Sequence, residues 1–251
     1  MPIVFVHGVP ETDAIWDPLV DQLAGRGHDD VVRLSPPGFG APLPDGFDPV
    51  RTSYVDWLAG QLEGIDGDID LVGHDWGAGH TAGLVSTRPE LVRSWVIDVA
   101  GLFHPDYEWH DMAQLWRTPE VGEQTIDGMM APPVEDKAAL LGTLGMPPEI
   151  ARRVAEANDE TMGRCILSLY RSAGPDALAA VWDGLPTAAM RPGLVLLPTA
   201  DHYAGPIETA AEVAARAGAT TTRLEDLGHW WMLEDPAAAA DALVTFWASL
   251  G

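Results

Sequence analysis

Short apolar runs alternate along the chain with longer segments in which apolar residues recur at helical spacing. The short runs predict six β-strands, over residues 3–7, 30–34, 69–73, 94–99, 193–199 and 220–225. The segments between them predict helices near 16–24, 50–63, 77–88, 207–217 and 236–250. The last helix begins at a proline, and Asp235 is its expected N-cap. Strands that alternate with helices are typical of a mostly parallel sheet covered by helices on both faces.

Residues 103–186 interrupt this alternation. They read as helical pieces broken by prolines, at Pro119, Pro132-Pro133 and Pro147-Pro148. The segment lies between two strand signals, so we expect it to cover the carboxyl edge of the sheet as a helical cap. The predicted organisation is an α/β core domain of residues 1–102 and 187–251, with the cap at 103–186 between its two parts.

Charge narrows the range of partners. The chain has 38 acidic and 14 basic residues among its 251, for a net charge of −24. Such a surface repels nucleic acid and anionic lipid, so we expect neither as a partner. Cys165 is the only cysteine, which rules out an internal disulfide and a cysteine-based metal cluster. No signal peptide or membrane-spanning run is recognisable, so a cytoplasmic protein is expected, with its oligomeric state open.

The strongest chemical signal is Gly73-His74-Asp75-Trp76-Gly77, which directly follows the strand predicted at 69–73. It has the frame of a nucleophile elbow, a sharp strand-to-helix turn that is usually G-x-S-x-G. Here Asp75 stands at the central position. An aspartate that attacks an ester would form a strained anhydride, whereas one that attacks a saturated carbon forms an ordinary ester. The exchange therefore favours substitution at carbon over ester hydrolysis.

Three further features follow predicted strands. His7-Gly8-Val9-Pro10 follows the first strand, where a loop amide completes an oxyanion hole, and the expected donors are the Val9 and Trp76 amides. Asp201 follows the strand at 193–199, and His229 follows the last strand within Leu227-Gly228-His229. The order nucleophile, acid, histidine is the order of an α/β-hydrolase.

These motifs resemble those of the α/β-hydrolase superfamily over nearly the whole chain, in its branch with an aspartate nucleophile. The H-G-x-P motif and the elbow are most similar to those of epoxide hydrolases, and haloalkane dehalogenases belong to the same branch. One departure is that the family usually has two strands before the H-G motif, which begins here at His7. The resemblance allows a second place for the acid, after the strand that follows the elbow, so Asp98 is an alternative to Asp201.

The resemblance implies a two-step hydrolysis without a cofactor or a metal. Asp75 attacks carbon, and water activated by His229 then hydrolyses the alkyl-enzyme ester. An epoxide oxygen leaves as an alkoxide and needs a proton donor, for which Tyr170 stands where the second cap tyrosine of epoxide hydrolases is expected. The first tyrosine position is not clearly filled, since Tyr107 comes early. The expected pocket residues are Tyr107, Trp109, Trp116 and Trp230.

Two other functions stay open. A haloalkane dehalogenase would hold its halide with Trp76 and an asparagine at position 9 or a second tryptophan, but position 9 is Val9. A binding protein that has lost turnover would keep the elbow alone. The sequence favours opening of a small apolar or aromatic epoxide to a diol, and it leaves the natural substrate and its stereochemistry open.

Overall fold

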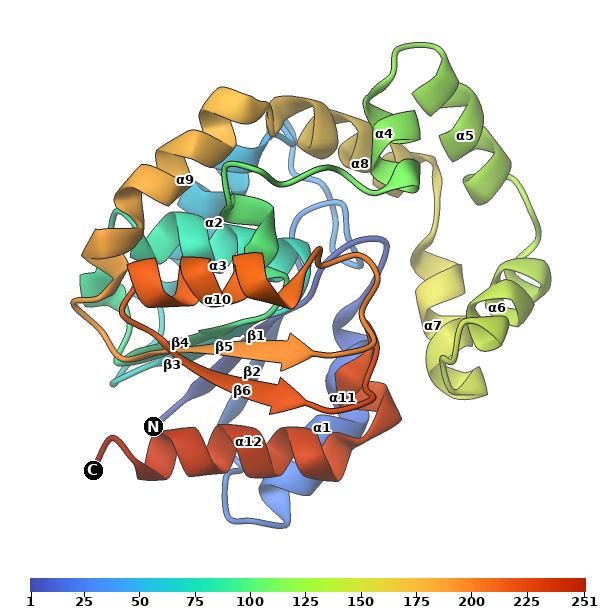
Figure 1. The fold of residues 1–251 in the computed structure, drawn as a ribbon. Helices are drawn as coiled ribbons and strands as arrows, with labels where there is room; N and C mark the ends of the chain where they lie inside the picture. The colour runs from blue at the N-terminus through green and yellow to red at the C-terminus, as the bar shows by residue number, and fades with distance from the viewer.

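A single sheet of six parallel strands forms the centre of the computed structural model, which describes residues 1–251 (Figure 1). The strand order is β2-β1-β3-β4-β5-β6. The strands are β1 (Ile3–Val6), β2 (Val31–Leu34), β3 (Asp70–Gly73), β4 (Ser94–Ile97), β5 (Gly193–Pro198) and β6 (Thr220–Leu224). Each lies within the residues predicted for it, so the predicted parallel sheet is confirmed.

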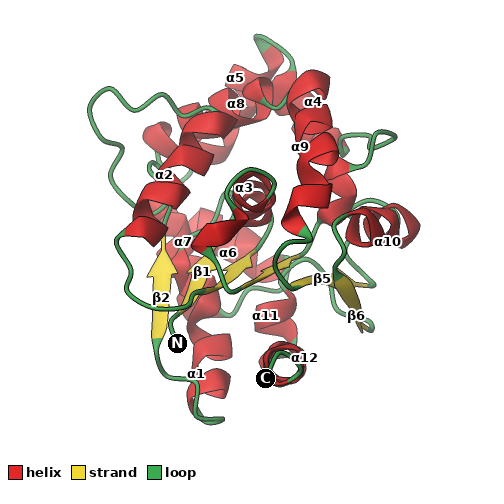
Figure 2. Cartoon of the chain, turned by 90° about the vertical axis from the view of Figure 1, so that its left-hand side faces the viewer, coloured by secondary structure: helices red, strands yellow, loops and turns green.

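Helices cover both faces of the sheet, as predicted (Figure 2). One face carries α2 (Arg51–Glu63), α3 (Trp76–Val85), α9 (Pro175–Ala188) and α10 (Ile207–Arg216). The other carries α1 (Asp17–Ala24), α11 (Trp231–Glu234) and α12 (Pro236–Ala248). Short 3-10 helices span Asp13–Trp16, Pro89–Leu91 and Ala100–Phe103. Asp235 caps α12 as expected, because its Oδ1 accepts a hydrogen bond from the Ala238 amide at 2.9 Å.

Two apolar clusters hold the helices to the sheet, one on each face. Trp95 is buried in the cluster beneath α3, and Trp16 and Trp231 are buried in the cluster beneath α1 and α12. Burial of one such large side chain contributes roughly 1.5–3 kcal/mol. Strands β1, β3, β4 and β5 are buried throughout, which is why they read as continuous apolar runs. The edge strands β2 and β6 are partly exposed.

The inserted segment between β4 and β5 is helical. After α4 (Asp111–Arg117) come α5 (Val121–Met130), α6 (Val134–Thr143), α7 (Pro148–Ala157) and α8 (Glu160–Ser172), on the side toward which the strand arrows point (Figure 1). Val181 and Leu185 of α9 instead join the core cluster beneath α3. The division into core and cap at residues 103 and 186 stays a prediction. None of the helices combines the length and the apolar character needed to cross a membrane.

Candidate active site

Asp75 lies at a strained turn between the end of β3 and the start of α3. Its φ is 50° and its ψ is −119°, a conformation that residues other than glycine rarely adopt. A Cβ on Gly73 would lie 2.4 Å from the Gly77 carbonyl oxygen, and one on Gly77 would lie 2.0 Å from the Val6 carbonyl oxygen. Neither position therefore tolerates a side chain. The two glycines let the chain turn tightly enough to present the Asp75 carboxylate beyond the sheet edge.

His229 faces this carboxylate from the loop after β6. Its Nε2 lies 4.0 Å from Asp75 Oδ1, and its Nδ1 lies 2.9 Å from Oδ2 of Asp201, which follows β5. Burial lowers the pKa of His229, but the Asp201 carboxylate outweighs this effect and the pKa ends above 6.5. Asp201 also accepts a bond from the Tyr203 amide at 2.7 Å. With Nδ1–H donated to Asp201, the Nε2 of neutral His229 is free to accept a proton beside Asp75.

The amide of Val9 reaches the carboxylate from the loop after β1. It donates to Asp75 Oδ2 at 2.9 Å. A Cβ on Gly8 would lie 2.2 Å from the same oxygen, so this loop can approach only because residue 8 is glycine. Trp76 is the first residue of α3, where a backbone amide has no acceptor within the helix. Of the two amides expected to stabilise an oxyanion, the Val9 amide contacts the Asp75 carboxylate, and the Trp76 amide is the next one along the chain after Asp75.

Asp98, the alternative acid, lies at the end of β4 and contacts other groups. Its Oδ1 accepts from the Asp75 amide at 2.9 Å. Its Oδ2 lies 2.5 Å from His74 Nδ1 and accepts from the Trp231 indole at 2.7 Å. The structure therefore brings Asp201 to His229 and Asp98 to the backbone of the elbow.

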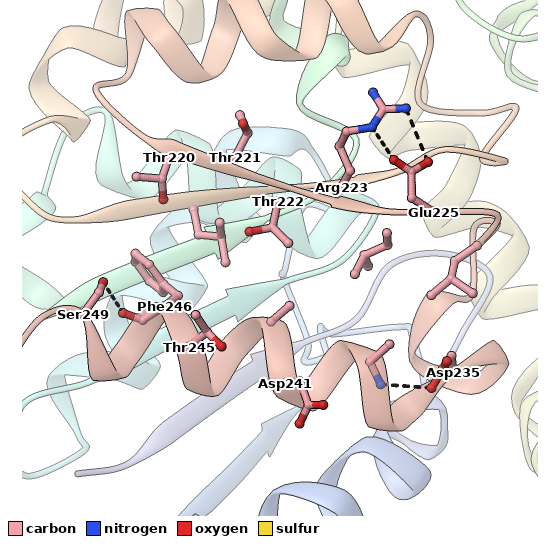
Figure 3. Close-up of a pocket in the computed structure, with 15 residues that line it drawn as sticks. Thr220, Thr221, Thr222, Arg223, Glu225, Asp235, Asp241, Thr245, Phe246 and Ser249 are labelled. Carbon is pink, nitrogen blue, oxygen red and sulfur yellow. Dashed lines mark hydrogen bonds and ion pairs between the residues drawn. The ribbon is translucent and has the colours of Figure 1, made fainter.

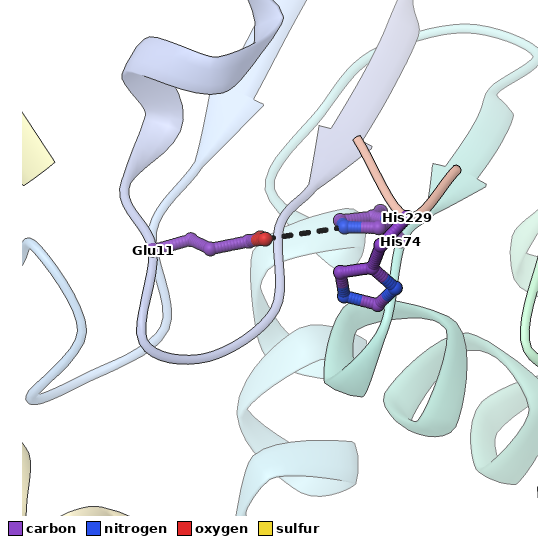
Figure 4. A group of neighbouring side chains, drawn as sticks. All are labelled: Glu11, His74 and His229. Carbon is purple, nitrogen blue, oxygen red and sulfur yellow. Dashed lines mark hydrogen bonds and ion pairs between the residues drawn. The ribbon is translucent and has the colours of Figure 1, made fainter. Parts of the chain in front are cut away.

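Glu11 and His74 form a buried ion pair beside His229 that the sequence did not reveal (Figure 4). His74 Nε2 lies 3.2 Å from Glu11 Oε1, and the ring centroids of His74 and His229 are 4.7 Å apart. Burial opposes both charges, yet the pair with His74 lowers the pKa of Glu11 to about 2. The carboxylates of Asp98 and Glu11 likewise raise the pKa of His74 well above 6.5. The one sequence signal for Glu11 was its place directly after His7-Gly8-Val9-Pro10.

The atoms of Glu11, His74 and His229 also lie close enough to hold a metal ion, within 4.8 Å of one another. Metal coordination requires neutral imidazole nitrogens. Both ring nitrogens of His74 already face carboxylates, and its raised pKa keeps the ring protonated. The arrangement is that of an ion-pair network supporting the elbow.

A small aromatic cavity lies directly over Asp75. Its free volume is only 20 Å³, which is about the space of one water molecule. It is lined by Asp75, Trp76, Val99, Leu102, Tyr107, Trp109, His110, Tyr170 and Tyr203. Of the expected pocket residues, Tyr107 and Trp109 line it, whereas Trp116 packs behind Tyr170 and Trp230 donates to Glu11 Oε1 at 2.5 Å.

Three tyrosines line this cavity, Tyr107, Tyr170 and Tyr203, and the Tyr107 hydroxyl donates to the Tyr203 carbonyl at 3.3 Å. Burial and the nearby Asp75 carboxylate raise the pKa values of Tyr170 and Tyr107 above their usual 10. Both phenols therefore remain protonated at neutral pH. The sequence analysis missed His110, which lines the same cavity and whose Nδ1 caps α4 by accepting from the Ala113 amide.

A larger cavity lies elsewhere, between β6 and α12 (Figure 3). Its volume is 660 Å³, and its walls include the threonines Thr220, Thr221 and Thr222. Arg223 and Glu225 pair with each other at 2.7 Å on its rim and are both exposed. None of the residues around Asp75 lines it, so its size does not make it the reaction site.

Comparison with known proteins places the whole chain in one family. A family model described as "Alpha/beta hydrolase family" matches residues 3–242. A hydrolase of (E)-2-((N-methylformamido)methylene)succinate from Acinetobacter baylyi is 30% identical over 97 residues, which is 38% of this chain and 36% of that protein.

Solved structures show the same fold. A loop variant of a haloalkane dehalogenase from Bradyrhizobium elkanii has a TM-score of 0.76 and 20% identity, covering 99% of this chain and 89% of that one. An E-2-(acetamidomethylene)succinate hydrolase has a TM-score of 0.69 and 17% identity, covering 98% of this chain and 91% of that one. At these identities the likeness establishes the fold alone.

Proposed function

Because the chain belongs to the alpha/beta hydrolase family, we propose that it is an epoxide hydrolase that acts through a covalent ester on Asp75. The observation that carries this proposal is an aspartate at the elbow, 4.0 Å from a histidine held by Asp201. Tyr170 lines the same cavity, and its phenol supplies the proton that an epoxide oxygen needs. An ionised aspartate needs no base to attack carbon.

In the first step, a carboxylate oxygen of Asp75 bonds to an epoxide carbon while the carbon–oxygen bond of the ring breaks. The released alkoxide takes a proton from Tyr170. In the second step, His229 removes a proton from water, and the hydroxide attacks the carboxyl carbon of the ester. The Val9 and Trp76 amides hold the oxyanion until it collapses, and the leaving alkoxide takes the proton of the added hydroxyl, which gives the diol and the free Asp75 carboxylate. The proton on His229 then returns to the tyrosine, so the cycle balances.

Replacement of Tyr170 by phenylalanine tests the leaving group. We expect Tyr170→Phe to slow diol formation by about 10². A general acid contributes about 10²–10⁴, and the lower end applies because Tyr107 remains. Release of halide from a haloalkane should be unchanged, since halide needs no proton. Tyr54→Phe is the matched control, because the Tyr54 hydroxyl donates to the Pro37 carbonyl outside this cavity. Equal diol formation by wild type and Tyr170→Phe would contradict the donor role.

A haloalkane dehalogenase is the second candidate, and one observation favours it. The indole rings of Trp76 and Trp109 both line the cavity, stacked at 24° with centroids 6.1 Å apart, so two N–H groups are available near a leaving halide. Val9 offers no side-chain donor. A panel of aryl and alkyl epoxides and haloalkanes separates the two enzymes. Binding without turnover across this panel would support a non-catalytic relative.

The cavity walls support a neutral, apolar or aromatic substrate. They contain no lysine or arginine, and Arg117 lies behind Trp109 with its guanidinium bonded to the carbonyls of Tyr170 and Ala173. A succinate derivative carries two carboxylates, and this cavity has no cation to hold them. The substrates for which the two similar succinate hydrolases are named are therefore not supported here.

The rate should depend on pH in a defined direction. Burial raises the pKa of Asp75 to about 6, so the first step should fail as the pH drops through 6 and the carboxylate is protonated. The second step needs neutral His229, and the pKa of His229 is raised. As the pH falls, the second step should therefore slow before the first step does. In the free enzyme the two groups interact, so its apparent pKa values belong to the pair, whereas in the ester only His229 titrates. Separate burst and steady-state rates across about pH 5 to 9 check this, and a steady-state rate that rises on acidification would contradict it.

A further inference from the structure

Arg51 is a buried cation without a protein partner. Its side chain lies between α2, α3 and α9, and the residue is only 9% exposed. Its guanidinium donates no hydrogen bond, and no carboxylate lies within 4.0 Å of it, whereas the backbone amide of Arg51 donates to Ser172 Oγ at 2.9 Å. A guanidinium always carries its charge and has five N–H donors. The Nε–H is buried without a hydrogen-bond partner, which is unfavourable, and an anion beside the guanidinium would pair with its charge.

The guanidinium borders a cavity of 210 Å³ with a second unsatisfied donor. The hydroxyl of Ser86 lines this cavity, is 6% exposed as a residue, and has no hydrogen-bond partner. The cavity is below the roughly 300 Å³ typical of drug-sized ligands and has room for about seven waters. Its size and its donors match a small oxyanion with some water.

Helix geometry strengthens the positive potential. Arg51 is the first residue of α2, whose first turn contains no acidic residue, so the partial positive charge of the helix end adds to that of the guanidinium. The C-terminal turn of α3 has an opposite dipole, but Thr87 Oγ1 bonds the Gly83 and Leu84 carbonyls there and Arg51 bonds neither. Asp56 also lines the cavity and is exposed, too far from Arg51 for an ion pair.

The charge of Arg51 is felt by a neighbouring residue. His80 is fully buried and neither of its ring nitrogens has a hydrogen-bond partner. Burial and then the positive charge of Arg51 lower the pKa of His80 to about 3.

We propose that this cavity is a binding site for a small oxyanion, a carboxylate or phosphate group, held by the Arg51 guanidinium and the Ser86 hydroxyl. The site is separate from the cavity over Asp75, because Ser86 lies ten residues, or about 15 Å, along the helix direction from Trp76. Bidentate contact with a planar guanidinium suits both oxyanions.

Titration calorimetry and thermal unfolding with inorganic phosphate, sodium acetate and sodium chloride at equal ionic strength test the site. We expect one saturable site for phosphate or acetate. At an anion concentration of 100 times the Kd, the midpoint of thermal unfolding should rise by about 5–10 °C. Whichever anion, phosphate or acetate, saturates the site at the lower concentration identifies the preferred group. Chloride should have the weakest effect, because it cannot make the bidentate contact.

Arg51→Gln should weaken binding at least tenfold and remove most of the midpoint shift. Arg88→Gln is the matched control, because Arg88 lies nearby but is exposed and already paired with Glu63 and Glu90. Ser86→Ala should weaken binding about 2- to 12-fold, the effect of one hydrogen bond, and it serves also if Arg51→Gln does not fold. Equal anion binding in wild type, Arg51→Gln and Ser86→Ala would overturn the proposal, as would the absence of saturable binding to the wild type.

Discussion

His229→Gln should trap the enzyme as a covalent ester. Asp75 is ionised at neutral pH and attacks carbon without help from a base, so the first step should survive the substitution. The second step loses its base, and turnover should fall by about 10²–10⁴. Intact-protein mass spectrometry after incubation with an epoxide should show the added mass of the whole substrate, on the peptide that carries Asp75. With a haloalkane, the added mass should lack the halogen.

Asp75→Ala is the control for this experiment, since it should abolish both adduct and turnover. A folded His229→Gln variant that stays unlabelled, with wild type active on the same substrate, would contradict the covalent mechanism. The absence of an adduct with both classes of substrate, in wild type and variant alike, would favour a binding protein instead.

Asp201→Asn should slow ester hydrolysis by about 10³–10⁴, by analogy with the loss of the acid in a serine protease triad. An amide cannot stabilise the imidazolium. When its NH₂ donates to His229 Nδ1, the ring proton moves to Nε2, which then cannot accept a proton from water. Formation of the ester should be nearly unchanged. Rapid-quench measurement of the burst and of the following steady state separates the two steps.

Asp98→Asn provides the comparison, because the sequence left the two acids as alternatives. Its amide oxygen can still accept from the Asp75 backbone, but the charge facing His74 is lost. We expect a lower free energy of unfolding, by about 3 kcal/mol as for a broken buried ion pair, and a smaller loss of hydrolysis than in Asp201→Asn. A reversed order of the two hydrolysis rates would identify Asp98 as the acid that assists His229.

The fold followed from the sequence because local patterns determine it. Parallel strands buried on both faces must be continuous apolar runs, so strands such as β3 and β5 were located to within one residue at each end. Asp235 and Pro236 predicted the start of α12, because N-capping and a proline at the first helical position are local effects. The placement of α9 was harder, because its packing beneath α3 depends on contacts between residues far apart in the chain.

The candidate site was only partly accessible to the same reasoning. The elbow is a local turn, and its glycines identified it. The choice between Asp201 and Asp98 depended on side-chain direction, which no spacing in the sequence determines. Glu11 and His74 were missed because their roles come from mutual burial across 63 positions in the chain. Tyr107 comes earlier in the sequence than the first cap tyrosine of epoxide hydrolases is expected. The fold nevertheless brings it to the same cavity as Tyr170.

The 20 Å³ cavity over Asp75 has a consequence for how tightly any substrate is held. A molecule larger than water fits only when the walls move apart, so the conformation described here is the state that does not bind. Measured affinity is the intrinsic affinity multiplied by the fraction of molecules that are open. If that fraction is about 1%, the apparent Kd is about a hundredfold weaker than the contacts alone would give. Substitutions in the inserted helices that favour opening should then lower KM without touching a substrate atom.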